Sequence, residues 1–302
     1  MQSALASFLA RFSLEITPRQ ADKLPLIAAR APKGTRVYIA LVDPADVEAQ
    51  FAAAIAARAH GFEPVPHIPA RFITDAADLE RRVAKLAGDA GVRQMLVLGG
   101  GASQPLGGFD AAIQLLRTGV FERHGIVRLG VAGHPEGNPD ITRKHGEAAL
   151  LAALREKQAY IASHGLDGYI ATQFLFAAEP VATWAAELRA AGIELPIHVG
   201  VPGPATIKTL VRYAAVCGVG NSARFLRKQA LNVAKLLSVS TPDEFVSDLA
   251  GLAMSNPALG IAAPHLYPFG GFDRLFDWLE PKLPERDTAL NRAPAPLQRR
   301  SW

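Results

Sequence analysis

The feature of this 302-residue chain that most constrains its fold is a regular alternation of short β-rich runs with longer stretches of helical periodicity. The β-rich runs are nearly continuous in apolar residues, as strands of a parallel sheet covered on both faces are. Eight runs occur, at 12–16, 37–42, 64–67, 94–98, 127–132, 168–173, 197–201 and 260–266. Eight strand–helix units in a chain of this length predict an α/β fold, a single-domain (β/α)8 or TIM barrel.

The stretches between the runs begin and end with helix signals. Gly192 follows the stretch 180–191, and glycine is common just after a helix C-terminus. The stretch 241–254 begins Thr-Pro-Asp-Glu, which combines an N-cap residue, a first-turn proline and first-turn acids. We expect helices over 46–60, 75–90, 110–124, 144–164, 180–191, 205–217 and 271–279, with extra helices late in the chain over 223–237 and 241–254.

A doubly wound open sheet is the alternative architecture. Such sheets usually carry a phosphate-binding loop after the first strand, and no such loop follows 12–16. The barrel is therefore favoured, and we expect it to occupy residues 1–285. Residues 286–302 are rich in proline and arginine and are expected to form a C-terminal tail.

Composition excludes several functional classes. Hydrophobic residues make up 49% and charged residues 20%, which excludes intrinsic disorder. Lysine and arginine number 32 against 28 acidic residues, an excess too thin for a nucleic-acid-binding face. Cys217 is the single cysteine, which excludes an intrachain disulfide and a cysteine-based zinc site.

Neither a secretory signal nor a membrane-spanning segment is expected in this chain. The first residues lack the basic and apolar regions of a secretory signal, and no apolar run reaches about 18 residues. We therefore expect a cytoplasmic protein without a membrane partner. The sequence leaves the oligomeric state open, a homo-oligomer included.

In a (β/α)8 barrel the chemistry lies where the strands end, so polar residues at those positions are the candidates. Glu15 stands in an otherwise apolar run and is expected to point into the barrel. Burial favours the protonated form of a carboxyl, which suits a general acid near neutral pH. A structural glutamate bonded to Arg19 is the alternative, and the residues alone do not separate the two.

Other strand ends carry weaker signals. Gln173 could bond the edge of a heterocycle or be a satisfied core amide. The triplet Gly99-Gly100-Gly101 allows a backbone to approach a phosphate, a flat ring or another loop. Three histidines at strand ends have no ligand spacing and no acidic cluster beside them, so no metal site is expected. They are His67, His134 and His265.

Five segments at the predicted strand ends match, in the same order, the motifs of one enzyme family. They are FSLEITPR at 12–19, VAGHPEGNPD at 131–140, ATQFLF at 171–176, LPIHVGV at 195–201 and HLY at 265–267, together with Pro-His at 66–67. On these segments the chain resembles the catalytic barrel of the methylenetetrahydrofolate reductases. The resemblance extends over residues 12 to 270.

The resemblance implies an oxidoreductase of folate one-carbon metabolism and methionine biosynthesis. Its substrates would be tetrahydrofolate derivatives, and hydride would pass from NADH or NADPH through FAD to the folate. Glu15 matches the family's general acid, and Gln173, Thr172 and Ile207 fall at its substrate contacts. The positions of its FAD contacts are His67, Gly99, Gly100, Gly101, Ala132, His134, Asn138 and Lys157.

The chain also departs from the family pattern. Gly99-Gly100-Gly101 stands where the family has Arg-Gly-Asp, so both charges of that loop are missing. The threonine that helps to hold the flavin is missing from 38–42, and Ile207 replaces an aromatic residue common there. These departures leave three hypotheses: a flavin-dependent reductase, a flavin-free reductase with direct hydride transfer from NADH, and a non-catalytic barrel that binds a pterin or a nucleotide.

Overall fold

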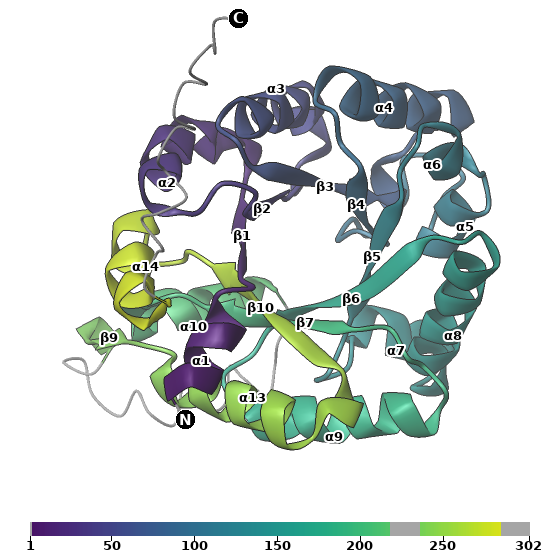
Figure 1. Cartoon of the computed structure of the whole chain (residues 1–302). Helices are drawn as coiled ribbons and strands as arrows, with labels where there is room; N and C mark the ends of the chain where they lie inside the picture. Colours follow the sequence, from purple (N-terminus) through teal and green to yellow (C-terminus); the bar gives the residue numbers. More distant parts are fainter. Residues whose placement is uncertain (1, 218–235, 285–302) are drawn as a thin grey trace, which may run out of the picture.

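A computed structural model describes residues 2–217 and 236–284. Eight parallel strands close into a barrel in the order β1-β10-β7-β6-β5-β4-β3-β2 (Figure 1). The strands are β1 (Ser13–Ile16), β2 (Arg36–Ile39), β3 (Glu63–Pro69), β4 (Gln94–Leu98), β5 (Arg128–Gly133), β6 (Asp167–Phe174), β7 (Ile197–Pro202) and β10 (Ile261–Tyr267). The (β/α)8 prediction is confirmed, and the open-sheet alternative is excluded.

The helices surround the barrel and connect successive strands (Figure 1). They are α1 (Gln2–Leu9), α2 (Leu24–Arg30), α3 (Val47–Ala59), α4 (Ala76–Asp89), α5 (Ala112–Leu116), α6 (Val120–Arg123), α7 (Pro139–His145), α8 (Ala148–Ser163), α9 (Ala178–Ala190), α10 (Ile207–Val216), α13 (Asp243–Ser255) and α14 (Phe272–Leu279). Short 3-10 helices are η1 (Pro18–Lys23), η2 (Pro44–Asp46), η3 (Ala70–Phe72), η4 (Pro257–Leu259) and η5 (Glu280–Lys282). The two-residue strands β8 (Ala205–Thr206) and β9 (Val239–Ser240) pair antiparallel outside the barrel.

Several helix boundaries differ from the sequence prediction. The expected helix 110–124 is two short helices, because Gly119 adopts a φ of 66° between them. The expected helix 205–217 begins at Ile207, since the two residues before it pair in β8. The helices α1 and α2 were not predicted. The expected tail 286–302 and most of the expected helix 223–237 lie outside the described residues.

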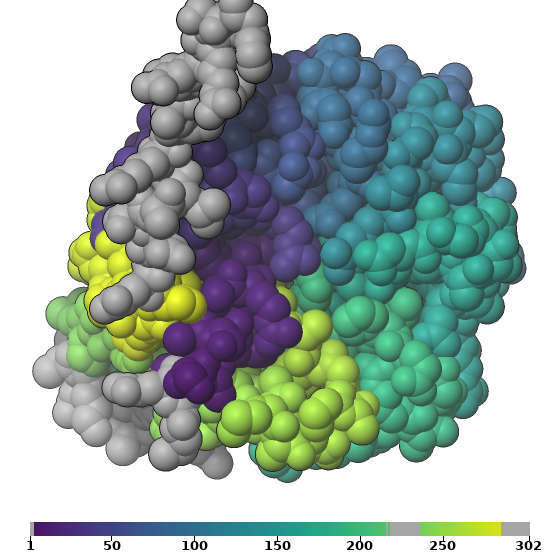
Figure 2. All heavy atoms as spheres, in the orientation of Figure 1, coloured from purple at the N-terminus to yellow at the C-terminus, as the bar shows by residue number. Residues whose placement is uncertain are grey.

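Helix α1 leads directly into β1, so it lies at the end of the barrel where the strands begin. Figure 2 shows its atoms between those of α13 and α14 on this face. No helix in the described parts of the chain is long and apolar enough to cross a membrane.

The strands divide their side chains between two environments. Leu14 and Ile16 join the main hydrophobic core, which lies between the barrel and the helices. The alternate positions point inward, where Tyr38 and Tyr169 are fully buried and joined by a hydrogen bond of 2.8 Å between their hydroxyls. Val65, Leu96 and Ala171 cluster with the two tyrosines, so the inside of the barrel holds apolar and polar side chains together. The polar side chains nearest the strand ends form its candidate sites.

Candidate active site

The carboxyl group of Glu15 lies inside the barrel, on the strand β1. Ser13 and Glu15 are two residues apart and therefore share the inward face, while Leu14 between them is buried in the outer core. The Glu15 side chain is 19% exposed, so it is desolvated on most sides and still reachable. Arg19 does not bond to it: its guanidinium donates to Asp46 at 3.1 Å and lies 3.7 Å from Asp43.

Two histidines contact Glu15 from other strands. Oε2 of Glu15 lies 3.5 Å from Nε2 of His67, on β3, and 3.5 Å from Nε2 of His265, on β10. Both rings are buried, with 9% and 1% of the residue exposed. From the sequence, no metal site was expected at these histidines, His67 was expected to contact FAD, and neither residue was placed beside Glu15. Within the described residues, no group of three or more ligand side chains is arranged to hold a metal ion.

The ring of His265 is held on its other side by Ser13. Ser13 Oγ and His265 Nδ1 are 2.9 Å apart, and Ser13 is fully buried. A hydroxyl can donate or accept, so this contact is compatible with either tautomer of the ring. Ser13, His265 and Glu15 therefore form a chain of polar contacts from the barrel interior to the strand ends.

His67 is an uncharged partner of Glu15. Burial lowers the pKa of His67 to about 4, although the Glu15 charge acts in the opposite direction. Its Nε2 has no hydrogen-bond partner among the described residues. A neutral imidazole with an unpaired buried nitrogen is equipped to bond a ligand placed beside Glu15.

The end of β6 holds Thr172 and Gln173 in a bulge against β7, where the register shifts between Ala171 and Phe174. Gly200 N donates to Thr172 Oγ1 at 2.9 Å, and Thr172 is 2% exposed. Thr172 therefore joins two strands rather than offering its hydroxyl to a ligand. Gln173 is half-buried, and its side-chain oxygen accepts from Phe174 N at 3.2 Å, which leaves the amide nitrogen to donate.

The glycine triplet follows β4 and is held by Arg71, a residue that the sequence analysis missed. Arg71 lies on η3, and its guanidinium donates to Ala102 O at 3.0 Å and to Asp110 Oδ1 at 2.6 Å. Gly100 has a φ of 92°, and a Cβ there would lie 2.9 Å from Pro69 Cβ. A Cβ on Gly101 would meet nothing within 4 Å, so this loop borders open space.

The end of β5 and the helix α8 bring His134 and Lys157 together. Burial lowers the pKa of Lys157 to about 8, and burial together with the Lys157 charge lowers that of His134 to about 4. Glu156, the acidic neighbour of Lys157, pairs with Arg117. The half-buried Ala132 precedes them on β5, and Asn138 caps α7 by accepting from Asp140 N at 3.0 Å.

Ile207 is the predicted site residue with the least accessible side chain after Thr172. It is the first residue of α10 and is 6% exposed, and its N–H donates to Ser238 O at 3.2 Å. Its described contacts lie at the start of α10. Its role toward a substrate stays a prediction.

Comparison with known proteins decides the family. The family model described as methylenetetrahydrofolate reductase matches residues 27–228, about two thirds of the chain. The chain belongs to the methylenetetrahydrofolate reductase family. The matched region contains Gln173, His67 and Lys157, while Glu15 and His265 lie on either side of it in the sequence.

Solved structures resemble the chain at low sequence identity. An uncharacterized protein from Clostridium thermocellum that binds two copies of 5-methyl-5,6,7,8-tetrahydrofolic acid has a TM-score of 0.55 at 14% identity, with 85% of this chain and 88% of that chain covered. Dihydropteroate synthase from Thermus thermophilus has a TM-score of 0.45 at 12% identity, with 89% and 93% covered. The first likeness agrees with the barrel fold.

Members of the methylenetetrahydrofolate reductase family typically use a flavin, and the residues of this chain fit one in two places. Lys157 and His134 are close, and in the described structure Lys157 forms no ion pair, so the two suit an anionic group such as a diphosphate. The loop at Gly101 borders open space without a side chain, which suits the approach of a flat ring.

Proposed function

We propose that this chain is a methylenetetrahydrofolate reductase that interconverts 5,10-methylenetetrahydrofolate and 5-methyltetrahydrofolate, with FAD as cofactor, NADH or NADPH as hydride donor and Glu15 as the general acid. Family membership supports the substrate class. The observation that carries the proposal is the position of Glu15, reachable at a strand end and 3.5 Å from each of two buried imidazoles.

The reaction needs a proton donor at one defined atom. In 5,10-methylenetetrahydrofolate a methylene carbon bridges N5 and N10, and hydride can reach that carbon only after the bond to N10 breaks. Protonation of N10 lets the electron pair of the C–N10 bond leave, which gives an N5-iminium ion. Addition of hydride then yields the 5-methyl product. A protonated Glu15 supplies the proton, a contribution of about 10²–10⁴ in rate.

Ser13 and His265 support both states of Glu15 in this scheme. When the Ser13 hydroxyl donates to Nδ1 of His265, the Nε2–H of the ring faces the carboxylate and stabilises its charge. When Nδ1–H donates to Ser13 instead, Nε2 can accept from a protonated Glu15. The Ser13 hydroxyl can donate or accept, so its contact with His265 is compatible with either protonation state of Glu15, provided that the ring exchanges protons and changes tautomer between the two states.

Gln173 is the residue proposed to bond the pterin ring. Its amide nitrogen can donate because its oxygen is held by Phe174 N. The barrel neighbour that binds 5-methyl-5,6,7,8-tetrahydrofolic acid supports a folate as ligand. We assign to FAD the residues His67, His134, Lys157 and the loop Gly99–Gly101, which would hold it. A flavin bound there would supply the hydride-transfer chemistry between nicotinamide and folate.

Replacement of Glu15 tests the proposal. The variant Glu15→Gln keeps the side-chain shape and cannot supply the proton, so we expect the rate of NADH-dependent reduction of methylenetetrahydrofolate to fall about 10²-fold or more. The control Glu187→Gln removes an exposed carboxylate on α9 and should retain full activity. Equal activity of Glu15→Gln and the wild-type protein would remove Glu15 from the mechanism.

The visible spectrum of the purified protein separates the flavin-dependent proposal from direct hydride transfer. The missing charges at Gly99 and Gly101 motivate that second candidate. A flavin spectrum whose chromophore is released as FAD on denaturation supports the first. A protein that is colourless, binds no added FAD and still reduces methylenetetrahydrofolate with NADH supports the second. A colourless and inactive protein that binds folate would instead be a non-catalytic barrel.

A further inference from the structure

A hollow lies at the opposite end of the barrel from Glu15. It has a volume of about 410 Å³ and is bordered by the segment before β1 and by the first residues of β2, β5, β7 and β10. Since all eight strands are parallel, their beginnings lie at one end and Glu15 at the other. Neither the predicted site residues nor the family's chemistry involves this end.

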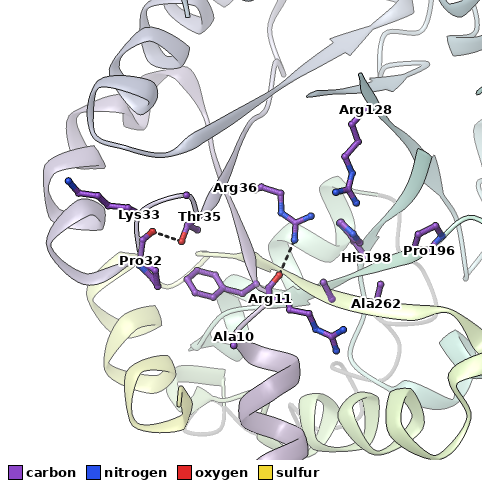
Figure 3. A pocket seen from close by; sticks show the side chains of 13 residues that line it. Ala10, Arg11, Pro32, Lys33, Thr35, Arg36, Arg128, Pro196, His198 and Ala262 are labelled. Carbon is purple, nitrogen blue, oxygen red and sulfur yellow. Dashed lines mark hydrogen bonds between the residues drawn. The ribbon is translucent and has the colours of Figure 1, made fainter. Parts of the chain in front are cut away.

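Four of the thirteen residues that line this hollow are lysine or arginine. Arg36 is the first residue of β2, Arg128 is the first of β5, and Arg11 immediately precedes the barrel. Figure 3 shows the guanidinium groups of Arg36 and Arg128 directed toward each other, with the ring of His198 beside them. Like charges placed together repel, so an anion between the two groups would stabilise this arrangement.

The protein compensates part of this charge, because the Arg128 guanidinium lies 4.9 Å from the centre of the Tyr169 ring. In the described structure Asp167 is the carboxylate paired with the cluster, its Oδ2 3.2 Å from Arg128 Nε. Arg36 donates to the carbonyl oxygen of Arg11 at 3.0 Å, a neutral acceptor. Arg11 and Arg36 therefore line the hollow without an ionic partner among the described residues. Arg36 is half-buried, and the Arg128 side chain is 28% exposed.

His198 is a buried imidazole in the lining of the hollow. The residue is 2% exposed, and its Nδ1 has no hydrogen-bond partner among the described residues. Its ring stacks on Tyr169 with centroids 4.4 Å apart, which fixes the direction of Nδ1. Burial and the charges of Arg36 and Arg128 lower its pKa, so the ring is neutral and can donate one N–H.

We propose that the hollow formed by Arg11, Arg36, Arg128 and His198 is a binding site for a small, multiply charged oxyanion, a phosphate or a polycarboxylate. Guanidinium groups bond both anions in the same bidentate way, so the lining defines the shared chemistry. The ligand's oxygens would neutralise Arg36 and Arg128 and accept the N–H of His198. A hollow of about 410 Å³ admits a small metabolite.

Calorimetric titration of the full chain with inorganic pyrophosphate and, separately, with citrate tests the site. Tight binding of pyrophosphate alone identifies a phosphate ligand, and tight binding of citrate alone identifies a polycarboxylate. We expect Arg36→Gln and Arg128→Gln each to lower the affinity for the anion about tenfold or more, since each removes one charge-assisted contact. The matched control Arg117→Gln removes an exposed arginine paired with Glu156 and should bind as the wild-type protein does.

Two further variants keep the test decisive if the arginine variants are unstable. Ala262→Leu narrows the hollow without removing charge and should also weaken binding, since Ala262 lines it. Glu15→Gln changes the other end of the barrel and should leave anion binding intact, so this proposal and the reductase proposal can fail separately. Absence of binding by both anions at low ionic strength, or unchanged affinity in Arg36→Gln and Ala262→Leu, would overturn the proposal.

Discussion

At the scale of single residues, the candidate site depends on which atoms inside the barrel have partners. Ser13 provides the buried contact to Nδ1 of His265, and the opposite ring nitrogen faces Glu15. A serine in this position can reverse the direction of its hydrogen bond, which an apolar residue of similar size cannot do. The function of Glu15 therefore depends on a side chain that does not itself reach the strand ends.

Ser13→Ala is expected to affect stability and activity together. The change leaves a buried imidazole nitrogen without its partner, which costs about 1–3 kcal/mol of the free energy of unfolding. We expect a lower urea midpoint and an altered pH profile of kcat, because the tautomer of His265 is no longer held. The control Ser163→Ala removes an exposed hydroxyl at the end of α8 and should change neither quantity. An unchanged pH profile would contradict the assigned role of Ser13.

At the scale of elements, the close approach of β6 and β7 sets the position of Gln173. A Cβ on Gly200 would lie 2.6 Å from the carbonyl carbon and oxygen of Gln173, closer than atoms of rigid backbone allow. The bulge in β6 and the hydrogen bond from Gly200 N to Thr172 hold this contact in place. The end of β6 can take this shape only because its neighbour has no side chain.

Gly200→Ala should therefore move the end of β6. We expect destabilisation of about 1–3 kcal/mol from the forced overlap, and a rise in KM for the folate because Gln173 shifts. Gly251→Ala is the control, because Gly251 lies inside α13 with nothing within 4 Å of its Cβ position. That change should stabilise the protein by about 0.5–1 kcal/mol. Thermal unfolding and steady-state kinetics of both variants distinguish the two effects, and a silent Gly200→Ala would refute the packing argument.

At the scale of the whole molecule, the barrel carries imidazoles that burial keeps neutral. The pKa of His67 and of His134 is lowered to about 4 from an ordinary value of 6.5, and burial together with the charges of Arg36 and Arg128 lowers that of His198 well below the same ordinary value. In the unfolded chain the same groups bind a proton near pH 6.5. Between pH 6.5 and 4 the unfolded state therefore binds more protons, and stability falls as the pH falls.

Acid sensitivity should consequently begin below pH 6.5, before most carboxylates titrate. Between pH 6.5 and 4 the free energy of unfolding is expected to fall by up to about 1.4 kcal/mol per pH unit for each such histidine. The urea midpoint should fall with it. His67→Gln should reduce that slope by the contribution of one proton, up to about 1.4 kcal/mol per pH unit. Equal slopes in the wild-type protein and His67→Gln would show that His67 is not kept neutral by burial.

The sequence predicted the barrel well and the site unevenly. All eight strands were found because a buried parallel strand is a continuous apolar run, visible in one dimension. Glu15 was found for the converse reason, as a charge inside such a run. Its partners His67 and His265 were seen as separate histidines, because contacts between residues far apart in sequence have no local signal. Ser13 could have been found, since it lies two residues before Glu15 on the same strand face.

Helix boundaries and loop supports were harder to predict from the sequence. The split at Gly119 and the start of α10 depend on a positive φ and on the pairing of β8, which helical periodicity does not record. Arg71 holds the glycine loop through backbone carbonyls, and any arginine in any loop could do so. Thr172 was expected to contact a substrate, but its hydroxyl is bonded to the neighbouring strand β7. Such a contact between strands has no local signal in the sequence.

The amino-acid sequence by itself determined the fold class, the strand order along the chain and the presence of a carboxyl inside the barrel, because these follow from local periodicity and from burial of apolar runs. Only the tertiary structure decided what surrounds that carboxyl and what lies at the opposite end. Closure of the barrel brings Arg36, Arg128 and His198 together from three strands, and His67 and His265 to Glu15 from two. Such convergence depends on distances in space, which separation along the chain does not encode.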